Sequence, residues 1–128
     1  MAQILEAAGM ISLALGGLSG FVMLAVVDYP DLIRKLGIVD TRRVRQVHLD
    51  WIIMGLVMVA VALAAPDLPA PAVYATLFGG VVNPATFIPM AFSRTASEHP
   101  AFRAISMISF ISLNVGLVWA ACHVVLAS

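Results

Sequence analysis

Polar side chains inside apolar stretches are the first candidates for chemistry in this chain. There are five of them, each set among aliphatic residues: His48, Asp50, Asn83, Asn114 and His123. Placing such groups in a nonpolar environment costs free energy and is tolerated only where partners are supplied. We therefore consider each of them for metal binding, substrate binding or helix pairing.

His48 is the strongest candidate for a metal ligand. On a helix its face continues to Trp51 and Ile52 one turn on and to Gly55 two turns on, where a glycine leaves room for a flat ligand. Haem iron is commonly held by a histidine whose second ring nitrogen bonds to an acceptor. These three residues would then contact the cofactor, whereas Asp50 lies about 200° round the helix and cannot be the acceptor. The alternative is an interfacial histidine bonded to a carbonyl or a lipid headgroup.

The other candidates have simpler interpretations. His123, beside Cys122, lies near the opposite end of the apolar segments from His48. Most of a hydrocarbon layer of about 30 Å would separate the two histidines, so they cannot ligate one iron within a subunit. Asn83 and Asn114 can pair with a neighbouring helix or with a substrate oxygen. The sequence contains no carboxylate pair, nucleophile triad or glycine-rich phosphate loop, and one cysteine excludes a disulfide framework.

The elements that must position these residues are membrane-spanning helices. A spanning helix needs about 20 mostly apolar residues, and four segments qualify: residues 4–27, 47–65, 73–92 and 102–127. The chain is 62% hydrophobic and 11% charged, which excludes an ordinary soluble domain, a disordered chain and a nucleic-acid binder. We predict an all-α integral membrane four-helix bundle, one domain over residues 1–128, assembled as a homo-oligomer.

The basic residues predict the orientation. All seven fall in the first connector or in and beside the third: Arg34, Lys35, Arg42, Arg43, Arg45, Arg94 and Arg103. These connectors share a side of the membrane, which the positive-inside rule assigns to the cytoplasm of a bacterial inner membrane. Both termini and the proline-rich hairpin at residues 66–71 then lie outside. We expect no signal peptide, because no basic residue precedes the first apolar run.

Local patterns predict packing and an interfacial segment. Ser12, Gly16 and Gly20 form a small-residue face that lets another helix approach the first one closely. Pro84 and Pro89 should bend the third helix. In the first connector, aliphatic residues alternate with basic ones. This pattern predicts a short surface-lying helix that anchors the chain, with a substrate lid as the alternative.

Two motifs resemble a known family. The run Arg45–Gly55, RQVHLDWIIMG, is similar to the second helix of small four-span membrane proteins grouped with styrene oxide isomerase and hydroxylaminobenzene mutase. The run Gly79–Asn83, GGVVN, with Phe87 beyond it, resembles a later helix of that family that carries an asparagine. The resemblance covers residues 42–92 and the four-span layout.

The resemblance implies a homotrimer with haem b at each subunit interface. His48 would be the axial ligand, Asn83 would line the pocket as a catalytic residue, and ferric iron would act as a Lewis acid that isomerises small hydrophobic epoxides to carbonyl products. This chain departs from the family at three positions: Met54, Gly79 and Phe87 stand where the family has an asparagine, an acidic residue and a tyrosine. Three polar groups around the reacting oxygen are therefore missing.

Three functions follow from these patterns. The first is a haem-binding isomerase that takes a small hydrophobic ligand from the lipid bilayer. The second is a non-enzymatic haem carrier, sensor or accessory subunit, which the missing polar groups favour. The third is a small four-helix transporter, which would need a glutamate deep in the first helix, whereas Glu6 lies near its end.

Overall fold

The fold consists entirely of helices. The computed structural model describes residues 1–128. In chain order the elements are α1 (Gln3–Asp28), α2 (Pro30–Lys35), α3 (Thr41–Ala64), α4 (Ala70–Ala85), α5 (Phe87–Phe92), the short 3₁₀ turn η1 (Ala96–Glu98) and α6 (Pro100–Ala127). Four helical segments are long and apolar enough to cross a membrane: α1, α3, α4 together with α5, and α6. The prediction of an all-α protein with four candidate spans is confirmed.

Two helices begin earlier than predicted because polar side chains cap them. Helix α3 begins at Thr41 rather than at residue 47, and the carboxylate of Asp40 accepts the backbone N–H of Arg42 at 3.1 Å. Arginines that we assigned to a connector therefore extend α3 by more than a turn beyond its apolar part. The imidazole of His99 caps α6 in the same way, accepting a backbone N–H of the first turn at 3.2 Å.

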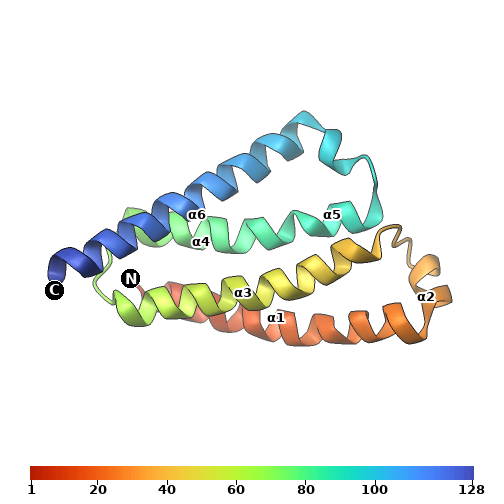
Figure 1. Ribbon diagram of the computed structural model, residues 1–128, viewed down its shortest axis with the longest axis horizontal. Coiled ribbons are helices and arrows are strands. Elements are labelled where there is room, and N and C mark those ends of the chain that lie inside the picture. Colours follow the sequence, from red (N-terminus) through yellow and green to blue (C-terminus); the bar gives the residue numbers. More distant parts are fainter.

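The long helices form two tight antiparallel pairs, α1 with α3 and α4 with α6 (Figure 1). Glycines bring the backbones together. A Cβ atom added to Gly9 would lie 2.8 Å from the carbonyl oxygen of Gly55, and one added to Gly55 would lie 2.8 Å from that of Gly9. In the second pair, a Cβ atom on Gly79 would lie 2.5 Å from the Cβ of Leu113, and Gly116 meets Thr76. The predicted small-residue packing of the first span is confirmed.

The third span is broken where its prolines predict. Helix α4 ends at Ala85 and α5 begins at Phe87, with Pro84 in the last turn of α4. A serine of the fourth span bonds to this span, as expected of serines in membrane helices. The Ser112 hydroxyl donates to the carbonyl oxygen of Ala75 at 2.9 Å.

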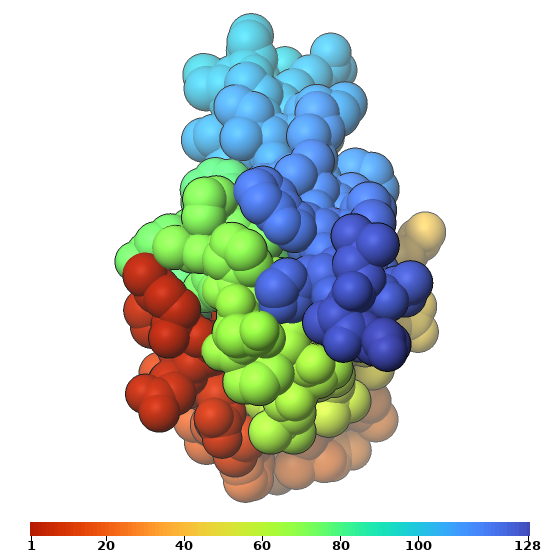
Figure 2. Space-filling view, turned by 90° about the vertical axis from the view of Figure 1, so that its left-hand side faces the viewer, coloured from red at the N-terminus to blue at the C-terminus, as the bar shows by residue number.

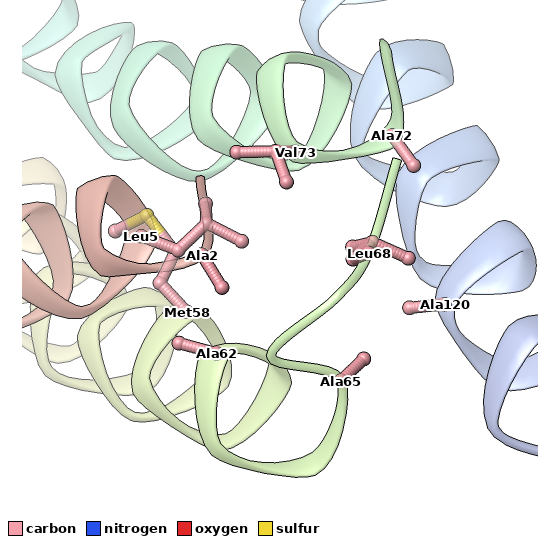
Figure 3. Packing of buried hydrophobic residues seen from close by; sticks show 9 residues of the cluster. All are labelled: Ala2, Leu5, Met58, Ala62, Ala65, Leu68, Ala72, Val73 and Ala120. Atoms are coloured by element: carbon pink, nitrogen blue, oxygen red, sulfur yellow. The ribbon is translucent and has the colours of Figure 1, made fainter. Parts of the chain in front are cut away.

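The larger of the two cores between the pairs lies at the end that carries both termini. Nine small or medium apolar side chains pack there, drawn from α1, α3, the following loop, α4 and α6 (Figure 3). They are Ala2, Leu5, Met58, Ala62, Ala65, Leu68, Ala72, Val73 and Ala120. Seen from this end, the N-terminus, the loop after α3 and the C-terminus lie together, while the beginning of α6 stands away from α1 and α3 (Figure 2).

The opposite, basic end has its own smaller core. Ile33 of α2 and Ile38 are buried against Val44 of α3 and Ala91 of α5. Gly37 makes this turn possible with a φ of 83°, a left-handed conformation that glycine adopts without steric cost. The short helix predicted in the first connector is therefore present and docked on the bundle.

Candidate functional site around His48

The imidazole of His48 is held by helix α1. Its Nδ1 lies 2.8 Å from the carbonyl oxygen of Gly16 and 2.9 Å from the Oγ of Ser19. A carbonyl oxygen can only accept, so Nδ1 must carry the hydrogen. The Ser19 hydroxyl donates its own proton to the same carbonyl at 2.7 Å, which leaves its oxygen as a second acceptor. The neutral imidazole therefore presents a free lone pair at Nε2.

Gly20 leaves helix α1 bare beside this ring, and Gly17 leaves it bare on its exposed side. A Cβ atom on Gly20 would meet only the Cε1 of His48, at 3.6 Å, and one on Gly17 would meet no atom within 4 Å. Cε1 is bonded to both ring nitrogens, so no α1 side chain from these two positions covers the Nε2 edge. The half-buried imidazole thus has an open approach on this side of α1.

The residues expected beside His48 lie in different environments. Helix α1 occupies the space expected next to Gly55, where an added Cβ atom would lie 2.8 Å from the carbonyl oxygen of Gly9. Ile52 also packs on α1, with its Cγ1 2.5 Å from the position of a Cβ on Gly16. Trp51 lines a cavity beside Ser19. The predicted face of α3 is therefore packed on α1 at Ile52 and Gly55, whereas α1 itself is bare at Gly17.

Asn83 and Asp50 pair with each other. The Nδ2 of Asn83 donates to the Oδ2 of Asp50 at 3.3 Å, joining α4 to α3, and the Thr86 hydroxyl donates to the Asn83 carbonyl at 2.6 Å. No hydrogen bond joins Asn83 to His48. As the helical spacing predicts, Asp50 is not the acceptor for the His48 ring.

His123 is a structural contact at the far end of the molecule. Its Nε2 donates to the Oδ1 of Asp67, in the loop between α3 and α4, at 3.2 Å. This hydrogen bond holds the pKa of the exposed Asp67 carboxyl below its ordinary value. Asn114 is exposed on α6 and donates to the carbonyl of Phe110 in its own helix at 2.8 Å.

The partners of the His48 ring were not identified from the sequence as its acceptors. Gly16 belonged to the predicted packing face, but its role as an acceptor depends on which α1 carbonyl lies opposite the histidine. Ser19 lies three residues after Gly16, next to that face, and only the register between α1 and α3 brings it to the ring. The available signal was the coincidence of a small-residue stripe on one span with a histidine on the next.

Comparison with known proteins adds no relative. No family model, no curated protein and no solved structure matches the chain. No group of three or more histidine, cysteine, aspartate or glutamate side chains lies together to hold a metal ion. The hydrogen-bonded His48 ring is therefore the feature of this chain that points to a function.

Proposed function

We propose that this protein binds haem b in the membrane, with Nε2 of His48 as the axial ligand of the iron. The observation that supports this proposal is the 2.8 Å contact from Nδ1 of His48 to the carbonyl of Gly16. A metal-bound histidine usually donates its other ring hydrogen to such an acceptor, which fixes both the tautomer and the ring orientation.

The residues present fit this cofactor. A porphyrin supplies the equatorial ligands of its own iron, so a single histidine is enough. The bare backbone at Gly17 and Gly20 offers a flat surface beside the imidazole. Gly20 borders the ring and Gly17 is exposed, so a second copy would have to cover the other side of the cofactor. We therefore propose a homo-oligomer, a trimer by the resemblance described above.

This chain's contribution is to hold and orient the ring. The Gly16 carbonyl and Ser19 fix the orientation and the tautomer of the imidazole by accepting its Nδ1 hydrogen. When bound, ferric haem would supply a Lewis-acidic iron. If the protein is an isomerase of small hydrophobic epoxides, Asn83 is the proposed catalytic residue, because its amide oxygen and second N–H are not used by Asp50 or Thr86.

A non-enzymatic haem carrier, sensor or accessory subunit is favoured by one specific observation. Gly79 is pressed against α6, so that even a methyl group would lie 2.6 Å from the backbone nitrogen of Leu113. The acidic residue that the resembled family carries at this position could not be accommodated in this packing. Phe87, which replaces the family's tyrosine, lies 5.9 Å from the guanidinium carbon of Arg43 as a cation–π contact. We therefore propose haem binding as the function and treat the isomerase reaction as one of two uses of the bound haem.

The absorption spectrum of the detergent-purified protein tests the proposal. Expressed with ample haem, the wild type should show a Soret band that His48→Ala abolishes. His123→Ala is the matched control and should keep the band, because that ring bonds to the exposed Asp67 at the other end of the molecule. A colourless wild-type preparation, or a band retained in His48→Ala, would overturn the assignment.

Turnover separates the two haem-binding functions. Loaded protein is incubated with styrene oxide and the aldehyde product is measured. Product formation that is lost in Asn83→Leu supports an isomerase. A loaded protein without turnover supports a carrier or sensor, and Met54→Asn with Phe87→Tyr then asks whether restoring two polar groups restores activity.

A further inference from the structure

An apolar cavity opens at the basic end of the bundle, on the other side of Ser19 from the α1 glycines. It has a volume of about 370 Å³ and is enclosed by α1, the segment after α2, α3 and α5. Nine of its ten lining residues are hydrophobic, and Ser19 is the exception. This volume is at the lower end of the range of small-molecule sites, which are apolar with few polar groups.

The cavity has a closed floor and an open mouth. Ile38, Val44 and Ala91 line it and are almost fully buried. Leu36 and Phe92 also line it, yet their side chains are 57% and 51% exposed. An elongated apolar group can therefore enter from the side of the short helix α2 and reach the buried aliphatic floor.

The charged residues around the mouth indicate the charge of the polar end of such a molecule. Every lysine and arginine of the chain lies at this end, seven in all, against four acidic residues at or beyond the helix ends here, Asp28, Asp31, Asp40 and Glu98. Arg34 pairs with Asp31 and Arg43 with Asp40. Lys35 makes no ion pair and directly precedes Leu36 at the mouth. An anionic group here would lie among an excess of positive charges beside the apolar mouth of the cavity.

We propose that this cavity holds one acyl chain of an anionic phospholipid, with its phosphate at the basic mouth near Lys35. The short helix α2 is docked where a surface-lying helix of a membrane protein meets the headgroups, so the phosphate and the cations lie at the same level. The cavity adjoins the proposed haem site at Ser19 and Trp51, but the proposal does not depend on the cofactor.

Tryptophan quenching by brominated lipid tests this proposal with an internal control. Trp51 lines the cavity, whereas Trp119 lies on α6 toward the other end, 42% exposed. Full-length Trp119→Phe and Trp51→Phe proteins, each with one tryptophan, are reconstituted without haem in phosphatidylcholine vesicles. Phosphatidylglycerol brominated at mid-chain is then added at increasing fractions, and brominated phosphatidylcholine is used in parallel.

We expect Trp51 to be quenched by the brominated anionic lipid at several-fold lower fractions than by the brominated neutral one, while Trp119 shows no such preference. Lys35→Gln should weaken the preference about fivefold, since one cation near the surface contributes about 1 kcal/mol. Ala91→Leu and the milder Val22→Phe, which fill the cavity from opposite walls, should abolish it. Equal quenching of both tryptophans by both lipids, or a preference unchanged in Val22→Phe, would show annular lipid only and overturn the proposal.

Discussion

Replacing Gly79 by alanine should loosen the α4–α6 pair more than any other single methyl addition at the glycines of the spans. The added Cβ would lie 2.5 Å from Leu113 Cβ, 2.6 Å from its nitrogen and 2.7 Å from its Cα. Nonpolar atoms prefer separations of about 3.5 Å or more, so the helices would have to move apart by about 1 Å. Overpacking costs about 1–3 kcal/mol. We expect the upper end, about 3 kcal/mol, because backbone and Cβ atoms cannot rotate away.

The assay is reversible unfolding in mixed micelles with increasing sodium dodecyl sulfate, followed by circular dichroism. A loss of about 3 kcal/mol lowers the folding equilibrium constant roughly hundredfold. Gly17→Ala is the matched control, since no atom lies within 4 Å of the added methyl group, and its stability should be unchanged. If Gly79→Ala unfolds at the same detergent fraction as the wild type, or if Gly17→Ala is equally destabilised, the close approach of α4 and α6 does not stabilise the pair.

Three further predictions concern polar contacts. Ser19→Ala leaves the carbonyl acceptor of the site histidine in place, so a haem titration should show affinity reduced by about tenfold rather than abolished. Asn83→Leu leaves Asp50 without its partner and should cost about 1–3 kcal/mol in the same unfolding assay, and adding Asp50→Leu should recover most of it; a further loss would contradict the pairing. The contact between Asp67 and His123 should be favourable above the ordinary carboxyl pKa of 3.8 and lost as the pH falls through the lowered folded-state pKa. The pH dependence of unfolding should therefore flatten slightly in Asp67→Asn, and an identical profile in both proteins would refute this.

The spans could be predicted from the sequence because lipid imposes their length and polarity. The predicted span at residues 4–27 agrees with helix α1 to within one residue at each end. The start of α3 was misplaced because apolarity alone marked it, while Asp40 and the arginines after it form a helical turn beyond the apolar part. A capping residue followed by charged helix formers is a signal of helix start that hydropathy does not include.

The candidate site was predictable only in part. A histidine near the end of an apolar helix could be singled out, since polar groups at that depth need partners. The acceptor of its ring hydrogen could not be predicted, because the register between α1 and α3 decides which α1 carbonyl lies opposite the histidine. Glycines permit several such registers. Gly55 illustrates the difficulty. Because it has no side chain, either a ligand or another helix can approach it, and in the structure the backbone at Gly9 does so.

The contact between the two helix pairs differs in kind from the contacts within them. Within each pair most glycines face backbone or a branched side chain, and Gly20 faces the His48 ring, whereas across the pairs Gly80 faces the sulfur and side-chain carbons of Met58. A thioether chain has several rotatable bonds and adapts to small displacements at little cost. The two pairs can therefore shift slightly against each other at Met58, whereas at the basic end the backbone N–H groups of Val39 and Asp40 hold α5 by donating to the Ala91 carbonyl at 2.8 and 3.2 Å. A change in the thickness or lateral pressure of the bilayer would be accommodated at this thioether rather than by a wider basic end.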